Sequence, residues 1–104
     1  MAYNIIAAAS FENDLDLATA YIAQILHNPT AARKLLGQIQ ETIQLIAEHP
    51  YMFSLFPDDE VARMGYRNTH IARYELFYRV DENARTVYIL RFLYAGQDIS
   101  SILK

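Results

Sequence analysis

The residues best suited to chemistry in this chain are the arginines and tyrosines of its C-terminal part. Every arginine but one lies from residue 63 onward, where tyrosines are interleaved with them. Guanidinium groups bind phosphate oxygens in pairs, and a phenol can stack on a base or transfer a proton. A surface that holds a nucleic acid could be formed by residues of the predicted sheet: Arg63, Arg67, Arg73, Arg79 and Arg91, with Tyr66, Tyr74, Tyr78 and Tyr94. The same residue types also suit a surface that binds an acidic or amphipathic protein segment.

Metal and cofactor chemistry has little support in the sequence. His27, His49 and His70 are far apart, and no pair of them has the spacing of metal ligands. The three glycines are isolated, so no phosphate-binding glycine loop is present. There is no cysteine, which excludes disulfides and thiolate ligands. We expect no metal site and no bound cofactor.

The charge of the chain is negative overall but unevenly distributed. Residues 1–62 hold two basic and eight acidic side chains, whereas residues 63–104 hold seven basic and four acidic ones, for a net charge of −3. An acidic chain is a poor general binder of nucleic acid, because neutralising phosphates supplies most non-specific affinity. Neither a signal peptide nor a membrane-spanning run is evident. We expect a single cytoplasmic domain, residues 1–104, with no membrane partner.

The hydrophobic pattern predicts the order of elements. Apolar residues recur at helical spacing after Ser10 and again after Thr30, and each of these two residues is the expected N-cap of its helix. We expect a strand over 3–8, helices over 10–26 and 30–48, a loop over 51–62, strands over 65–71, 74–80 and 86–94, and a short helix opening at Gln97. This order, β-α-α-β-β-β, predicts an α+β fold in which a helical hairpin packs on a mostly antiparallel four-stranded sheet.

The last of these strands is apolar on both faces, which is typical of a central strand covered on each side. Strict alternation assigns its side chains to two sets. One set is Tyr88, Leu90, Phe92 and Tyr94; the other is Val87, Ile89, Arg91 and Leu93.

Three segments of the C-terminal half carry a family resemblance. Arg67 follows a glycine–aromatic pair, residues 72–80 read ARYELFYRV, and residues 87–98 read VYILRFLYAGQD. With DLDLATAYI and PTAARKLLGQI in the N-terminal half, the chain resembles the RelE/ParE superfamily. Its members are the toxins of type II toxin–antitoxin and plasmid-stabilisation systems.

The resemblance implies one of two activities. RelE-like members cut mRNA on the ribosome with basic residues on the sheet, and ParE-like members poison DNA gyrase. Here the position after Tyr74, often arginine in the ribonucleases, is Glu75, and Tyr94-Ala95-Gly96-Gln97 stands where further basic residues would be expected. We therefore expect a ParE-like toxin that binds a target such as gyrase and is not an enzyme. The alternatives are a ribosome-dependent endoribonuclease using Arg67, Arg91 and Tyr94, with Glu75 as a conceivable base, and a relative whose site has decayed.

The resemblance also implies a dedicated partner, an antitoxin encoded beside this gene. Such antitoxins wrap the toxin with a C-terminal segment, often a helix. A small domain rich in apolar residues is expected to leave some of them exposed as a groove for an amphipathic helix, unless all pack internally. The candidates for this partner-binding surface are Leu35, Leu36, Ile43, Phe53, Phe56, Ile99, Ile102 and Leu103.

Overall fold

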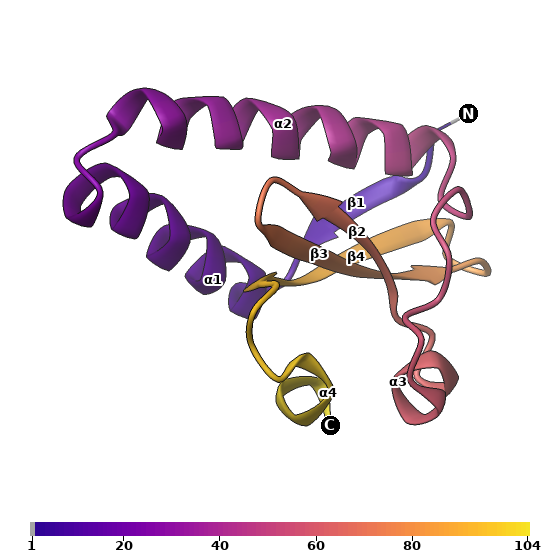
Figure 1. Ribbon diagram of the computed structural model, residues 1–104. Coiled ribbons are helices and arrows are strands. Elements are labelled where there is room, and N and C mark those ends of the chain that lie inside the picture. The colour runs from indigo at the N-terminus through magenta and orange to yellow at the C-terminus, as the bar shows by residue number, and fades with distance from the viewer. Residues whose placement is uncertain (1) are drawn as a thin grey trace.

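A computed structural model describes residues 2–104 as a helical hairpin lying over a four-stranded sheet, with two short helices beneath it (Figure 1). The order of elements confirms the predicted fold class and the short C-terminal helix. In chain order the elements are β1 (Asn4–Ala7), α1 (Ala9–Ala20), one π-helical turn η1 (Tyr21–Ile25), α2 (Pro29–Glu48), α3 (Asp59–Arg63), β2 (Arg67–Ile71), β3 (Tyr74–Asp81), β4 (Thr86–Tyr94) and α4 (Ile99–Leu103). No helix within residues 2–104 has both the length and the apolar character needed to cross a bilayer.

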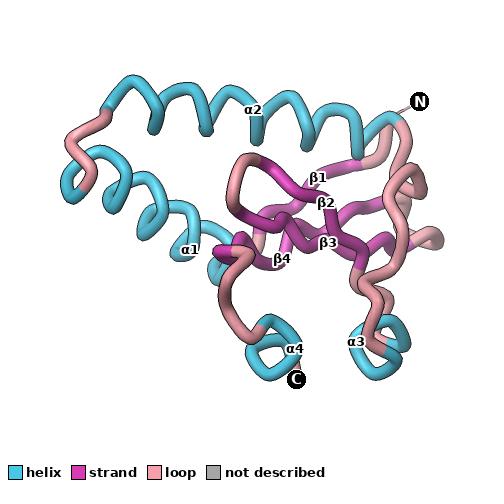
Figure 2. The backbone as a smooth tube through the Cα atoms, viewed as in Figure 1, coloured by secondary structure: helices cyan, strands magenta, loops and turns pink. Residues whose placement is uncertain are grey.

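The sheet has the strand order β1-β4-β3-β2. β1 runs parallel to β4, and the other two pairs are antiparallel, so β4 is a central strand as predicted. α1 and α2 cover one face of the sheet, and α3 and α4 lie against the other (Figures 1 and 2). We call these the hairpin face and the lower face.

The main core fills the space between the hairpin and its face of the sheet. α2 supplies Leu35, Ile39 and Ile46, whose spacing places them on one side of the helix. The strands supply the largest buried side chains of this core, among them Leu76, Tyr78, Val87, Ile89 and Phe92. The buried Tyr78 hydroxyl donates a hydrogen bond of 2.8 Å to the Pro50 carbonyl, which ties the loop after α2 to the sheet.

A smaller cluster lies on the lower face, where Phe77, Leu93 and Ile99 are buried together. Phe56, Tyr66 and Leu103 pack around them. The end of α4 is tied to α3, because the Lys104 ammonium lies 3.2 Å from the Asp58 carboxylate and 3.4 Å from that of Glu60. The two short helices therefore form one unit over this part of the sheet.

A β-bulge in β4 corrects the predicted assignment of its two faces. Tyr78 pairs with Ile89, but its neighbour Phe77 pairs with Arg91, so Leu90 is an extra residue without a partner on β3. An extra residue reverses the alternation beyond it. Phe92 and Tyr94 consequently share the hairpin face with Val87 and Ile89, and Arg91 and Leu93 lie on the lower face. Because β4 is apolar on both faces, the pattern alone could not reveal the reversal.

Both predicted N-caps are wrong. The N-cap of α1 is Ala8, two residues before Ser10, and the Ser10 hydroxyl instead donates to the carbonyl of the bulged Leu90 at 2.8 Å. Asn28 caps α2 in place of Thr30, accepting from the Ala31 amide at 3.0 Å. The reason is that proline, which lacks an N–H and has a preset φ, suits the first helical position, so the helix starts at Pro29.

The hairpin and the following loop also differ in detail from the prediction. The first helix was expected to continue to Leu26, but regular α-helix ends at Ala20 and the π-helical turn η1 follows. The segment 51–62, expected to be a loop, contains the start of α3. The Asp58 side chain caps this helix by accepting from the Val61 amide at 3.2 Å, and Asp59 and Glu60 occupy its first turn.

Candidate functional site

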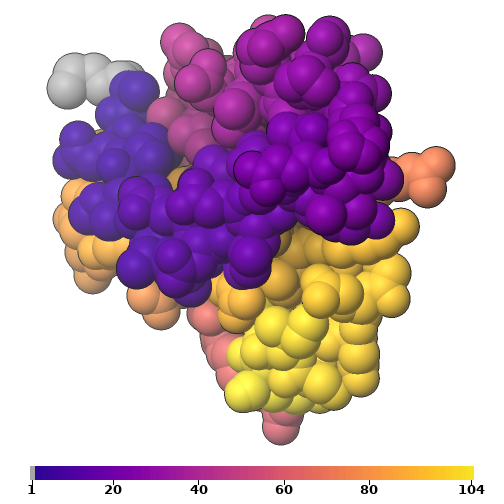
Figure 3. Space-filling view, turned by 90° about the vertical axis from the view of Figure 1, so that its left-hand side faces the viewer, coloured from indigo at the N-terminus to yellow at the C-terminus, as the bar shows by residue number. Residues whose placement is uncertain are grey.

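An open groove of about 1030 Å³ lies at one end of the sheet. Its walls come from α1 and η1, the start of α2, the β2–β3 turn, the end of β4, and α4. Figure 3 looks onto this end of the molecule, where the hairpin, in indigo and violet, lies above the yellow C-terminal segment. The groove therefore lies where parts of the chain that are distant in sequence come together.

The groove is lined mainly by apolar side chains that remain in contact with water. Leu17 is 73% exposed, Leu26 55% and Tyr94 44%. Leu17 and Tyr21 are one turn apart on a side of the helix that α2 does not cover, whereas Phe11 and Ala18 of the same helix are buried. A contiguous apolar surface of this kind commonly marks a site of interaction with another protein.

Three tyrosines, Tyr21, Tyr74 and Tyr94, line the same groove. The Tyr74 ring stacks on Phe92 with the ring centres 4.8 Å apart, and its centre is 5.7 Å from that of Tyr94. The pKa of Tyr74 is raised, first by burial and then by the neighbouring hydroxyls of Tyr21 and Tyr94. The three phenols are thus close enough to influence one another, and in their neutral form they are hydrogen-bond donors facing the groove.

Arg91, one of the candidates for catalysis, is held by Asp14 of α1. Its Nε and Nη2 atoms donate to the two carboxylate oxygens at 2.7 and 3.1 Å. The Phe92 amide donates to the same carboxylate at 3.0 Å. The hydrogen bonds to Asp14 raise the pKa of Arg91, although burial opposes them. This arginine lines the groove, but its charge is already neutralised by a bidentate partner.

Arg67, the second candidate, lies outside the groove. It pairs with Tyr78 on β3, whereas Tyr94 pairs with Tyr74 of the same strand. Tyr74 and Tyr78 are four residues apart, which is about 13 Å along β3. Its Nη1 donates to the Phe53 carbonyl at 2.7 Å, and its guanidinium lies 4.9 Å from the centre of the Tyr51 ring. The structure therefore brings Arg91 and Tyr94 to one groove and leaves Arg67 at a different place.

Arg67 borders a cluster centred on Glu82 of the β3–β4 turn. The Tyr3 and Tyr51 hydroxyls both donate to this carboxylate, at 2.7 Å each. Arg85 lies over the Tyr3 ring, with its guanidinium 4.3 Å from the ring centre. The shared hydrogen bonds lower the pKa of Glu82 and raise that of Tyr51 to about 12. The cluster joins the start of β1, the loop after α2 and the β3–β4 turn.

Glu75, the conceivable base, lies on the lower face as alternation predicts, opposite to Tyr74 and Tyr94. It is buried and accepts a hydrogen bond of 2.8 Å from the Asn68 side chain. His70 Nε2 lies 3.5 Å from the same carboxylate. Within residues 2–104 no group of histidines and carboxylates is arranged to hold a metal ion.

The residues predicted to bind a partner divide into three groups by exposure. Leu36 and Ile102 are exposed, and Ile102 lines the groove. Leu35 and Ile99 are buried in the two clusters, although Leu35 also lines the groove. The other four are partly buried against those clusters: Ile43 and Phe53 against the main core, Phe56 and Leu103 against the lower one.

Sequence reasoning missed Leu17, Tyr21 and Leu26, which form much of the exposed lining. The helical spacing after Ser10 predicts the helix but does not show which of its apolar side chains stay exposed. The available signal was an excess of apolar residues in the first helix. Leu15, Ala18 and Ile22 already supply one buried or half-buried side, so Leu17 and Tyr21 must face elsewhere.

Comparison with known proteins gives the family. The profile described as "ParE toxin of type II toxin-antitoxin system, parDE" matches residues 5–99. The chain belongs to the ParE toxin family. This membership confirms the predicted place in the RelE/ParE superfamily and, at that level, the class of a type II toxin.

Two solved structures share the fold of this ParE-family chain. One is described as the chromosomal ParDE toxin–antitoxin system of P. aeruginosa. It is 18% identical, with a TM-score of 0.71 over 90% of this chain and 97% of that one. The other is the RelBE2 toxin–antitoxin complex of Mycobacterium tuberculosis, 20% identical, with a TM-score of 0.58 over 90% and 99%. A search of the curated proteins finds no match.

Replacing Asp14 by alanine is expected to destabilise this ParE-family protein by about 2–3 kcal/mol, because a half-buried guanidinium and a backbone amide lose their acceptor. The free energy of unfolding in urea measures the loss. Asp16→Ala, an exposed change in the same helix, is the matched control and should have little effect. Equal stability of the two variants would show that the Asp14–Arg91 pair does not hold α1 to β4.

Tyr51 is expected to ionise only near pH 12, because its hydroxyl donates to the Glu82 carboxylate. A folded-state pKa raised above the ordinary value of 10 means that this stabilisation is complete below pH 10 and is lost as the pH rises toward 12. Tyrosinate absorbance followed against pH measures it. Tyr51→Phe should remove one tyrosine that ionises near pH 12. Glu82→Gln should lower the pKa of Tyr51 toward its ordinary value of 10. A titration unchanged by Glu82→Gln would contradict the assignment.

Proposed function

We propose that this chain arrests growth by binding DNA gyrase, and that an antitoxin encoded beside it silences it by occupying the groove. Membership of the ParE family supports the target, because gyrase is the target that the ParE side of the superfamily implies. Gyrase works in the cytoplasm, which fits the predicted location. The observation that carries the proposal is the open apolar groove between the hairpin and the end of the sheet.

The groove suits a segment of protein. Leucine and tyrosine side chains in water favour a partner that covers them, and burial contributes about 25 cal/mol for each Å² of apolar surface removed from water. The groove is open to solvent and is lined in part by residues of α1, α2 and α4, so a further amphipathic helix can lay its apolar face against it. The two structural neighbours are themselves described as toxin–antitoxin assemblies, which supports an antitoxin as the occupant.

The geometry favours a binding function over the ribonuclease alternative. Cleavage at a ribose 2′-OH needs a proton acceptor and cations placed together around one phosphate. Arg91 is neutralised by Asp14, Arg67 lies at a different place and contacts Phe53 and Tyr51, and Glu75 is on the opposite face from Tyr94. The three candidates for catalysis thus do not converge on one site.

Induced expression without the antitoxin is expected to stop growth and cause DNA damage, and the purified chain is expected to inhibit supercoiling by purified gyrase. Because the proposed inhibition is stoichiometric binding, it should scale with the ratio of toxin to gyrase. Supercoiling that stays normal at a large excess of the chain would refute gyrase as the target. Codon-positioned cuts in translated mRNA, mapped by primer extension, would establish the ribonuclease alternative.

Leu17→Glu is expected to abolish rescue by the co-expressed product of the adjacent reading frame, since it places a charge in the apolar groove. The side chain is largely exposed, so the fold should survive, and growth arrest should persist. Leu45→Glu is the matched control, an exposed leucine on α2 outside the groove. Gel filtration of the co-expressed pair measures the complex. Co-migration of the Leu17→Glu variant with the partner at micromolar concentration would mean that the antitoxin binds elsewhere.

A further inference from the structure

The charge of the groove is opposite in sign to the charge of the chain. Four side chains that are charged at pH 7 line the groove, one acidic and three basic: Asp14, Lys34, Arg73 and Arg91. The whole chain has a net charge of −3. Charges gathered in a cleft with apolar walls focus the local potential, because the walls screen poorly. The groove is therefore a cationic site on an acidic protein.

Two of these charges cancel within the groove. Arg91 and Asp14 form the bidentate pair described above, so their opposite charges together add little to the electrostatic potential that a ligand meets. Lys34 and Arg73 are different, because both are exposed and neither has an ion-pair partner among residues 2–104. The positive charge offered to a ligand is thus that of these two residues.

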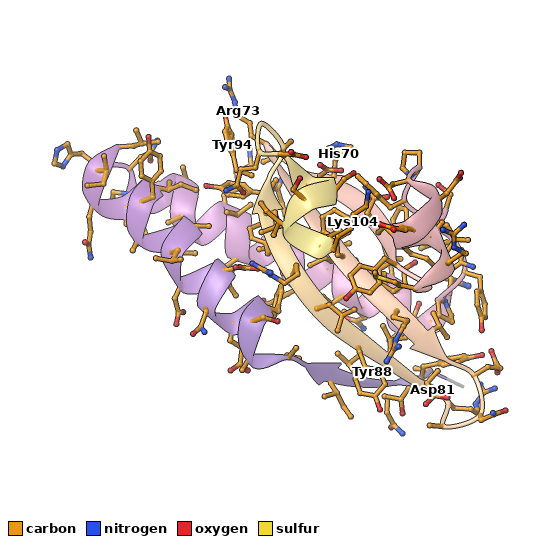
Figure 4. The ribbon with its side chains drawn as sticks, turned by 90° about the horizontal axis from the view of Figure 1, so that it is seen from below. His70, Arg73, Asp81, Tyr88, Tyr94 and Lys104 are labelled. Carbon is orange, nitrogen blue, oxygen red and sulfur yellow. The ribbon has the colours of Figure 1, made fainter. Side chains whose placement is uncertain are left out.

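Lys34 and Arg73 belong to different walls. Lys34 is on the first half of α2, and Arg73 is in the turn between β2 and β3. Figure 4 shows Arg73 at the same end of the sheet as Tyr94, with its side chain extending away from the strands. A backbone hydrogen bond joins the β2–β3 turn to the end of β4, since the Ala95 amide donates to the Arg73 carbonyl at 2.9 Å. A ligand lying on the aromatic floor would therefore have a cation available from each wall.

We infer that the groove selects an acidic amphipathic protein segment, whose apolar side chains cover the leucines and tyrosines while its carboxylates pair with Lys34 and Arg73. The inference depends on the proposed function, because it describes the antitoxin segment that would occupy the site. A segment with basic residues at these places would be repelled by the same two cations. The pair therefore acts as a determinant of which partner the groove accepts.

The apolar lining favours a protein over a nucleic acid. Two cations and three phenols could bind a phosphate and stack on bases, as sites for single strands do. The leucines and isoleucines beside them offer nothing to the ribose hydroxyls and base edges that would be buried, and burying unpaired polar groups is unfavourable. A carboxylate-bearing helix needs only a few charged contacts and can present carbon to the rest of the groove.

Charge reversal tests the inference directly in the purified complex with the product of the adjacent reading frame. Lys34→Glu and Arg73→Glu should each weaken the affinity by about tenfold at low salt, and the double variant should weaken it further. Raising the salt concentration should shrink these differences, because exposed charges are screened. Arg33→Glu and Arg79→Glu are the matched controls: they make the same charge change at exposed residues outside the groove and should bind nearly as the parent protein does.

The outcomes separate this inference from the proposed function. If Leu17→Glu abolishes the complex while both reversals bind like the parent, the groove is the site but charge does not select its occupant, and the inference is wrong. If Leu17→Glu also binds like the parent, the groove is not the antitoxin site. The proposed occupant of the groove is then wrong, and the inference that depends on it is wrong as well.

Two further measurements complete the test. Restored affinity when the reversals are paired with a partner whose groove-contacting glutamates are changed to lysine would support the inference. If an oligouridylate binds the parent protein and is lost in Lys34→Glu while the partner's affinity is unchanged, the groove belongs to nucleic acid and the inference is overturned. Circular dichroism confirms that each variant remains folded.

Discussion

The carboxylate of Asp14 is the contact on which the arrangement of this domain depends. It accepts three hydrogen bonds from β4, two from Arg91 and one from the Phe92 backbone, at a point where the strand has just passed its bulge. One helical turn earlier, the Ser10 hydroxyl donates to the carbonyl of Leu90, the bulged residue. Two residues on one side of α1 therefore hold three consecutive residues of the central strand and fix the angle of the helix across the sheet.

The groove is a product of that arrangement. The bulge turns Phe92 and Tyr94 toward the hairpin, where Tyr74 stacks beside them and forms an aromatic floor. Asp14 ties α1 to β4, and the exposed residues Leu17 and Tyr21, at the end of this helix and in η1, form one wall of the groove. The second apolar side of α1 leaves a surface that stays incomplete within the single chain.

Local pattern was sufficient to predict the architecture but not the site. The two-sided apolar character of residues 86–94 indicated a central strand, and the apolar residues that recur at helical spacing after Thr30 indicated a second helix. The bulge could not be predicted, because both faces of β4 look alike in sequence. Asp14 and Arg91 are 77 positions apart in the sequence, so no periodic pattern could show that the aspartate neutralises the arginine. The exposure of single apolar residues could not be predicted for the same reason. Whether Leu17 or Leu35 is buried depends on contacts with residues that are distant in the sequence.

The edge strand β1 has a consequence for how the protein behaves in concentrated solution. The opposite edge, β2, carries Arg67 and is partly shielded by the bridge from Leu55, but Asn4–Ala7 contains no charged residue and forms an outer strand of the sheet. Uncharged edges are templates for pairing between molecules. Colloidal stability therefore relies on the long-range repulsion of the net negative charge. That repulsion vanishes near the isoelectric point of about 5.5 and fades in high salt, so mildly alkaline buffers of low ionic strength keep separate molecules apart.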